Sequence, residues 1–330
     1  MVYKHLLGVA PPPTRPGSGV TPANALDDDQ RRSRHLSTRK TAVETSTPLL
    51  PVNSARVIFD GFRTTPVLDH PEGLDLDPVD GSLWCGGEAG QLFRIDLAAK
   101  SIELIDQNPG GFILGLRFTA DRQVIWLDAV RRQVRRLAVG TGRPVEVLVD
   151  GAVGDHQLVY PNALDITDDG VIYVSDSEGD GQTGGGAIYR LTPDGPPEVW
   201  CPGPFHFANG VAVSPDGNWL YVAESASRAV CRVAILPDGS AGGIERLWTL
   251  GYRVPDGLAF GPDGQLYTAC YYPSVILRLE SDGGVTTVYE DPIGHTLSNP
   301  TNLVFVGTDA LVANLGRWHI TSIDMRAALS

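Results

Sequence analysis

One short pattern recurs six times along the chain, and it constrains the fold more than any other feature of the sequence. Each copy begins with an opening residue, which is followed in most copies by a glycine or an alanine. Alternating apolar residues, a turn and another apolar strand come next. The copies lie 42, 48, 47, 47 and 45 residues apart. They are Glu72-Gly-Leu-Asp-Leu, Leu114-Gly-Leu-Arg-Phe, Asn162-Ala-Leu-Asp-Ile, Asn209-Gly-Val-Ala-Val, Asp256-Gly-Leu-Ala-Phe and Thr301-Asn-Leu-Val-Phe. A unit of this length cannot bury its apolar face alone, so neighbouring units must pack on one another.

Apolar residues within each unit alternate with period two, which predicts short strands. The fourth unit shows four of them, at 211–214, 219–223, 229–233 and 244–248, with Pro-Asp-Gly turns between the first and the last pairs. Units of about 45 residues with four antiparallel strands are typical of propeller blades. The predicted fold is therefore an all-β, six-bladed β-propeller.

The two ends of the repeat region predict how the ring closes. Segment 55–61 resembles the fourth strands of other units, whereas the last unit ends after three strands, at 319–324. The N-terminal strand should therefore complete the last blade and remove two exposed edges. Residues 51–330 form the predicted propeller. Residues 1–50, rich in proline and charge runs, are predicted to be a disordered or loosely ordered tail.

Composition excludes several classes of function. The net charge is −13, so a polyanion is repelled and nucleic acid is not expected as a partner. No window approaches the eighteen uninterrupted apolar residues of a transmembrane helix, so no membrane partner is expected. The four cysteines are widely spaced, which indicates buried thiols in a reducing compartment. We expect a cytoplasmic protein.

Polar residues open most of the six repeats. The first strand of each blade lines the axis of a propeller, so the opening residues should converge there as a ring. Glu72, Asn162, Asn209 and Asp256 together offer two carboxylates and two amide oxygens, a donor set that suits a hard divalent cation. Each residue alone is more simply a turn-forming residue at a strand start. The set predicts one bound cation, Ca²⁺ first, with Mg²⁺, Mn²⁺ and Zn²⁺ left open.

Four further residues are candidates for contacts with a small-molecule substrate. Thr301 completes the ring, although a hydroxyl at a strand start also bonds the backbone. His206 lies three residues before Asn209, either as a proton shuttle at the channel mouth or as a packing residue. Tyr160 and Tyr271 either shape access to the axis or pack between blades.

Several motifs carry a resemblance to a known family. They are Pro71-Glu-Gly, Pro161-Asn-Ala-Leu-Asp, Ala208-Asn-Gly-Val-Ala-Val-Ser-Pro-Asp-Gly and Pro255-Asp-Gly-Leu-Ala-Phe. Over about residues 55 to 325 the chain resembles the senescence-marker-protein/gluconolactonase family, which includes regucalcin and bacterial sugar lactonases. The resemblance implies a six-bladed propeller and metal-dependent hydrolysis of lactones.

The resemblance also implies roles for individual residues. Glu72 and Asn209 match metal ligands, and Asp256 matches the aspartate that is both ligand and presumed base. Asn162 matches an asparagine beside the metal, either as a ligand or as a substrate contact. One departure concerns the substrate. Tyr160-Pro-Asn replaces the Arg-x-Asn of regucalcin-like members, so an arginine contact to sugar hydroxyls is missing.

These observations predict a metal-dependent hydrolase that opens a lactone or a related small ester. The cation would polarise the carbonyl while Asp256 accepts a proton from the attacking water. Two alternatives stay open. Segment 209–225 also resembles strictosidine-synthase-like propellers, which suggests condensation or cyclisation in small-molecule biosynthesis. A non-catalytic interaction platform is the other alternative, although such a platform needs no polar ring on the axis.

Overall fold

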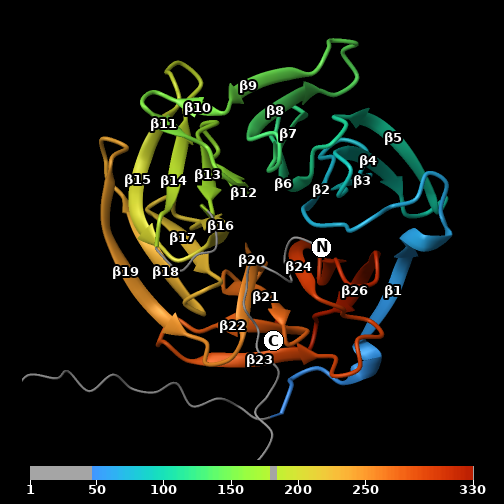
Figure 1. Cartoon of the computed structure of the whole chain (residues 1–330). Coiled ribbons are helices and arrows are strands. Elements are labelled where there is room, and N and C mark those ends of the chain that lie inside the picture. Colours follow the sequence, from blue (N-terminus) through green and yellow to red (C-terminus); the bar gives the residue numbers. More distant parts are fainter. Residues whose placement is uncertain (1–46, 179–183, 330) are drawn as a thin grey trace, which may run out of the picture.

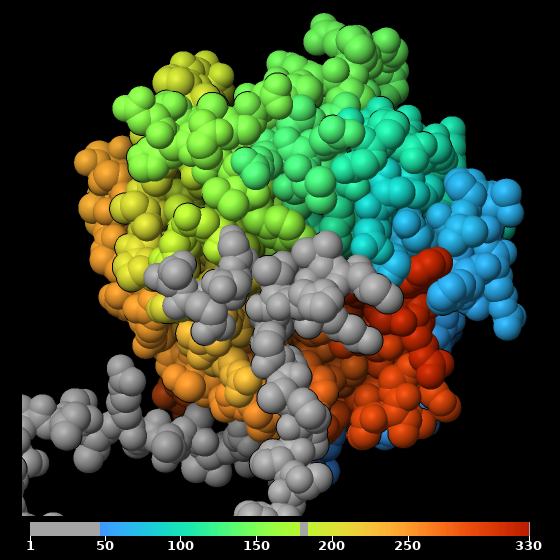
Figure 2. Space-filling view, viewed as in Figure 1, coloured from blue at the N-terminus to red at the C-terminus, as the bar shows by residue number. Residues whose placement is uncertain are grey.

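The computed structural model describes residues 47–178 and 184–329. Six four-stranded antiparallel sheets follow one another around a central axis, which confirms the predicted six-bladed β-propeller (Figure 1). Blade 1 comprises β2 to β5, blade 2 β6 to β9, blade 3 β12 to β15, blade 4 β16 to β19 and blade 5 β20 to β23, while blade 6 comprises β24, β25, β26 and β1. The space-filling view shows the blades in sequence order around the disc, with the blue N-terminal strand beside the red last blade (Figure 2).

Each blade runs from an inner strand at the axis to an outer strand at the rim. The inner strands are β2 (Leu74–Leu76), β6 (Ile113–Phe118), β12 (Pro161–Ile166), β16 (Ala208–Val213), β20 (Val254–Phe260) and β24 (Pro300–Val306). The second strands are β3 (Leu83–Gly86), β7 (Gln123–Asp128), β13 (Ile172–Asp176), β17 (Trp219–Glu224), β21 (Leu266–Tyr272) and β25 (Asp309–Asn314).

The third and outer strands complete the blades. The third strands are β4 (Gln91–Asp96), β8 (Gln133–Ala138), β14 (Gly186–Leu191), β18 (Ala229–Ile235), β22 (Val275–Leu279) and β26 (His319–Asp324). The outer strands are β5 (Ser101–Gln107), β9 (Glu146–Asp150), β15 (Glu198–Phe205), β19 (Ala241–Thr249), β23 (Val285–Glu290) and β1 (Ala55–Asp60). Two 3₁₀ turns, η1 (Val52–Ser54) and η2 (Gly61–Arg63), flank β1, and a small hairpin of β10 (Ala152–Val153) and β11 (His156–Gln157) precedes blade 3.

Strand β1 closes the ring as the sequence predicts. It pairs antiparallel with β26, from Ala55 opposite Ile323 to Asp60 opposite His319. Beyond the strand, the Gly61 N–H donates to the Trp318 carbonyl at 2.8 Å. The blade built from the two ends of the propeller therefore has no unpaired edge at β26.

Residues just before the predicted boundary at residue 51 already pack on the propeller. The backbone N–H groups of Leu49 and Leu50 donate to the carbonyls of Thr287 and Val288 on β23, and Leu50 is buried. The remainder of the predicted tail, residues 1–46, lies outside the described residues.

The core consists of apolar side chains between the faces of neighbouring blades. One such cluster joins Tyr173 and Trp200 of blade 3 to Val222 and Val233 of blade 4. The alternation seen in the sequence explains it, because each central strand of a blade packs against a neighbour on both faces. All four cysteines are free and buried, as predicted. No helix in the described part of the chain is long and apolar enough to cross a membrane.

Candidate active site

The opening residues of the six repeats form a closed ring at the axis. The Gly73 N–H donates to the Leu114 carbonyl at 2.8 Å, and the Thr301 hydroxyl of blade 6 donates to the Glu72 carbonyl of blade 1 at 3.2 Å. A Cβ atom added at Gly73 would lie 2.1 Å from the Leu114 oxygen, so glycine there permits the close approach of two inner strands. These contacts confirm that the repeat positions are neighbours around the axis.

Beta-bulges aim most of the ring side chains. The pairing of the inner and second strands shifts register around Leu114, Asn162, Asn209, Asp256 and Thr301. A bulge re-aims the extra residue and interrupts pairing at that point, and bulges are frequent beside active sites. All six ring residues are at most 4 % exposed. The ring thus presents two carboxylates, two amides, one hydroxyl and one leucine in a setting with little access to bulk water.

Two serines hold the asparagines of the ring. Asn162 Nδ2 donates to Ser177 Oγ at 2.9 Å, and Asn209 Nδ2 donates to Ser225 Oγ at 3.0 Å. Each serine hydroxyl donates its own hydrogen bond to a backbone carbonyl of the next blade. Ser177 donates to the Ala208 carbonyl, and Ser225 donates to the Pro255 carbonyl. The serine oxygen can then only accept from the asparagine, so the amide NH₂ group must face the serine. Each amide oxygen is thereby turned away from its serine.

Burial strongly perturbs the two ring carboxylates. It raises the pKa of Glu72 to about 8, although the nearby Thr301 hydroxyl opposes the shift. Burial also raises the pKa of Asp256 well above its usual range, and the Glu72 charge raises it further, while a hydrogen bond from the Asn209 side chain opposes both effects. Each carboxylate in this buried site disfavours the charged form of the other. A bound cation would remove this repulsion and favour both charged forms.

The donor set fits a hard divalent cation. Glu72 Oε1 is buried and has no hydrogen-bond partner. Among residues 47–178 and 184–329, no group of three His, Cys, Asp or Glu side chains is placed to hold a metal ion. A cation at the axis would therefore need the amide oxygens of Asn162 and Asn209 beside the two carboxylates. All of these ligands are oxygens, as Ca²⁺ and Mg²⁺ prefer.

An apolar cluster lies next to the ring and includes one of its members. We call Phe112, Leu114, Ala129, Phe207 and Leu315 the axial apolar cluster, against which Tyr160 and Tyr271 pack. The Tyr160 hydroxyl is buried without a hydrogen-bond partner. Burial and the charges of Glu72 and Asp256 raise the pKa of Tyr271 to about 12, and burial together with Glu72, Glu88 and Asp256 raises that of Tyr160. Both tyrosines are therefore close enough to the carboxylates to sense their charge.

The predicted shuttle residue His206 lies in the turn between β15 and β16. Its backbone N–H donates to Glu224 Oε1 at 3.0 Å. A Cβ atom added at Gly184 would lie 3.0 Å from its imidazole ring. The role of His206 in proton transfer stays a prediction.

The sequence analysis missed a repeated device that positions the turns before the ring. A buried polar residue ends the second strand in four blades, and its side chain accepts from a backbone N–H of that turn. Asp128 accepts from Phe112, Asp176 from Tyr160, Glu224 from His206 and Asn314 from Ser298. Aligning the second strands of the repeats would have revealed these positions and the serines that follow two of them, in Asp176-Ser and Glu224-Ser.

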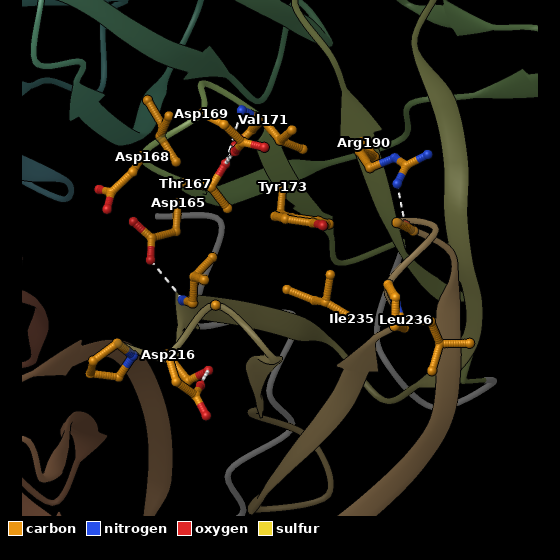
Figure 3. Close-up of a pocket in the computed structure, with 17 residues that line it drawn as sticks. Asp165, Thr167, Asp168, Asp169, Val171, Tyr173, Arg190, Asp216, Ile235 and Leu236 are labelled. Carbon is orange, nitrogen blue, oxygen red and sulfur yellow. Dashed lines mark hydrogen bonds between the residues drawn. The ribbon is translucent and has the colours of Figure 1, made fainter.

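A pocket of about 580 Å³ lies at the other end of blades 3 and 4, where the inner strands finish (Figure 3). The turns Thr167–Val171 and Ser214–Trp219 border it. Three of its four aspartates, Asp165, Asp169 and Asp216, accept hydrogen bonds within the protein. Asp165 accepts from the Val213 N–H at 2.8 Å, and Asp216 accepts from the Ser214 hydroxyl. We therefore place the candidate active site at the ring and assign no role to this pocket.

Comparisons with known proteins identify a family region that spans the ring positions. A family model described as the SMP-30/gluconolactonase/LRE-like region matches residues 70–313. Lactonase drp35 from Staphylococcus saprophyticus is 25% identical over 262 residues, which cover 73% of this chain and 76% of that protein. A 6-deoxy-6-sulfogluconolactonase from Pseudomonas putida is 27% identical over 241 residues, 68% of this chain and 75% of that protein.

One curated relative carries the name of the alternative class. The protein strictosidine synthase-like 6 from Arabidopsis thaliana is 24% identical over 315 residues, which cover 80% of this chain and 81% of that protein. The sequence is therefore similar both to proteins named lactonases and to one named strictosidine synthase-like.

Solved structures share the fold. A gluconolactonase from Xanthomonas campestris superposes with a TM-score of 0.68 at 18% identity and covers 82% of this chain and 89% of its own. A calcium-binding regucalcin from Agrobacterium tumefaciens gives a TM-score of 0.64 at 17% identity and covers 78% and 92%. The family model spans most of the chain and includes every ring position. The protein is thus a member of the SMP-30/gluconolactonase/LRE-like family.

Proposed function

We propose that this protein is a metal-dependent lactonase whose active site is the axial ring. One observation carries the proposal. Two buried carboxylates with raised pKa values, Glu72 and Asp256, share the axis with two serine-held asparagines in a member of a family that contains lactonases. A purely structural ring would not retain two carboxylates that destabilise each other.

Glu72, Asn162, Asn209 and Asp256 would hold the cation, for which Ca²⁺ is our first expectation and Mg²⁺, Mn²⁺ and Zn²⁺ are alternatives. When bound, such a cation supplies a Lewis acid that polarises the lactone carbonyl and stabilises negative charge on its oxygen. The serines contribute by fixing the asparagines. Outer hydrogen bonds of this kind keep a ligand group in one orientation.

Asp256 acts as the general base of the proposed reaction. Its carboxylate accepts a proton from a water molecule as the water oxygen bonds to the carbonyl carbon. The ring C–O bond then breaks, and the proton passes to the departing alkoxide oxygen. The product is a hydroxy acid, which ionises near neutral pH, so each turnover releases one proton. Asn209 keeps the base in place through its hydrogen bond to Asp256.

The biosynthetic alternative has specific support in the relative named strictosidine synthase-like 6. A condensation joins two substrates and does not place an oxygen atom from solvent in the product. Hydrolysis in ¹⁸O-labelled water places one labelled oxygen in the hydroxy acid. Isotope incorporation therefore separates the two proposals on the same protein sample.

The first experiment combines metal analysis with an activity assay. The full-length protein is analysed for bound metal by mass spectrometry, and proton release from a panel of lactones is followed with a pH indicator, with and without chelator. We expect about one equivalent of metal and proton release that chelator abolishes and added cation restores. The Asp256→Asn variant should hydrolyse lactones about 10² to 10⁴ times more slowly, whereas Glu103→Gln, on the outer strand β5, should match the wild type. Activity that is unaffected by complete metal removal would refute the metal-dependent mechanism.

A further inference from the structure

Side chains from five different blades meet beside the ring. In the axial apolar cluster, Phe112, Leu114 and Ala129 come from blade 2, Phe207 from blade 4 and Leu315 from blade 6, while Tyr160 of blade 3 and Tyr271 of blade 5 pack against them. Residues of so many blades can touch one another only where the blades converge. The cluster therefore surrounds the axis at the end of the propeller that carries Glu72 and Asp256.

Backbone hydrogen bonds fix this layer of side chains directly beside the ring. Phe112 and Phe207 each lie two residues before a ring residue, and their carbonyls accept from the residues that follow the second strands, Ala129 and Ser225. Leu315 follows the second strand of blade 6, and its N–H donates to the carbonyl of Asn299, the equivalent position there. The same two positions of the repeat thus supply both the apolar layer and the serines that hold the asparagines.

Several polar side chains of this layer already have partners in the protein. The Ser177 and Ser225 hydroxyls bond the ring asparagines and the next blade, and Asn299 Nδ2 donates to the Tyr271 carbonyl at 3.0 Å. On the blade 1 side, His70 Nδ1 lies 2.7 Å from Glu88 Oε2. Within the described residues of the layer, the Tyr160 hydroxyl is a buried polar group without a partner.

We propose that the lactone opened at this site carries an alkyl or aryl substituent rather than a polyhydroxylated sugar chain. This inference rests on the proposed lactonase function and names its substrate class. The half-buried rings of Tyr160 and Tyr271, with Leu315 beside them, are the members of this layer that a substrate can contact. Hydroxyl groups placed against these apolar surfaces would lose water without gaining hydrogen bonds, which disfavours binding. Methylene and aryl groups gain from leaving water at the same surface. The unpaired Tyr160 hydroxyl is placed to donate one hydrogen bond to an oxygen of the lactone.

The test compares lactones that differ only in the apolar substituent. We measure kcat/KM of the metal-loaded wild-type protein for δ-hexalactone, δ-octalactone and δ-decalactone, with δ-gluconolactone as the polar counterpart. Burial of each added methylene should raise kcat/KM about fourfold, which corresponds to about 0.8 kcal/mol. Four methylenes separate the shortest from the longest alkyl lactone, so we expect a rise on the order of a hundredfold, with δ-gluconolactone below the alkyl series.

Two variants and one binding measurement locate the effect. Leu315→Asn should remove most of the chain-length dependence, while the apolar control Leu315→Met should keep it. Tyr160→Phe should lower kcat/KM by a similar factor for all lactones in the series, because it removes a bond to the common ring. Calorimetry with a δ-lactam that carries a pentyl group should show binding that Leu315→Asn weakens, independently of turnover.

The outcomes separate this inference from the function on which it rests. Rising kcat/KM along the alkyl series, with δ-gluconolactone poorest, supports the inference. Hydrolysis of every lactone, with no chain-length dependence and with δ-gluconolactone best, overturns the substrate class and leaves the lactonase function standing. Absence of hydrolysis for all lactones in the presence of added cation overturns the lactonase function, and the inference with it.

Discussion

Glu72 should make the cation-free protein less stable as the pH rises. Its pKa is about 8 in the folded protein and 4.5 in the reference state, so between these values the folded chain binds more protons than the unfolded chain. The free energy of unfolding then falls as the pH increases through this window. For Glu72 alone, the two pKa values give a loss of about 3 to 4 kcal/mol between pH 5 and pH 8. Asp256, whose pKa is also raised, acts in the same direction.

The difference between the wild type and Glu72→Gln isolates this contribution. Both proteins are treated with chelator and unfolded by heat or urea at several pH values from 5 to 8. Because glutamine does not titrate, the free energy of unfolding of the variant should rise relative to that of the wild type by about 3 to 4 kcal/mol over this range. For a chain of this size, that corresponds to about 7 °C in Tm. Saturating cation at pH 8 should restore the wild type, because it neutralises the buried charges and binds only the folded state.

Glu103→Gln is the control for the loss of a carboxylate as such, because the Glu103 side chain is 64% exposed. Its unfolding curve should follow the wild type at every pH. Parallel pH profiles for the wild type and Glu72→Gln would refute the reasoning. They would mean that Glu72 is as well solvated in the folded chain as in the unfolded one, and the electrostatic case for a cation at the axis would fail with it.

Three further predictions concern individual residues. Asp256→Asn should lower the rate of lactone hydrolysis by about 10² to 10⁴ with an unchanged circular dichroism spectrum, as expected for a general base; near-wild-type activity would exclude that role. Ser177→Ala and Ser225→Ala should each weaken cation binding about tenfold or more in calorimetry, because the asparagine loses its fixed orientation; unchanged affinity in both would show that the serines only join blades. Trp318→Ala should lower Tm, since it removes a ring stacked on Phe62 with centroids 4.3 Å apart; an unchanged Tm would show that this contact adds nothing to ring closure.

The repeat made the fold and the ring positions predictable. Residues such as Asn209 and Asp256 occupy the same place in units of similar length, so identical local structure brings them to one axis whatever the details of packing. Closure by segment 55–61 was predictable for a related reason. The last unit has only three strands, and segment 55–61 is a single strand that precedes the first unit. Both inferences depend on counting and periodicity and need no knowledge of side-chain contacts.

Contacts between blades could not be predicted in the same way. Ser177 and Ser225 join a ring asparagine to a carbonyl of the next blade, and a single sequence does not show which atoms face each other across that gap. The β-bulges at the ring were hidden too, since an extra residue in a short strand leaves the alternation nearly intact. Leu49 and Leu50 pair with β23 although they lie between Pro48 and Pro51, in a segment whose composition predicts a tail.

The blade that closes the ring lies next to one of the two carboxylates at the axis. Trp318 follows the second strand of the blade that β1 completes, and its ring contacts both Phe62, just after β1, and His70, two residues before Glu72. Thr301 of the same blade bonds the Glu72 carbonyl. The joint between the first and last blades therefore lies beside one of the two carboxylates. Loss of β1 pairing would disturb Thr301 first, because blade 6 alone among the six described blades is completed by a strand from the other end of the chain. Glu72 would follow through its bond to Thr301, whereas Asn162, Asn209 and Asp256 lie in blades that need no closing strand.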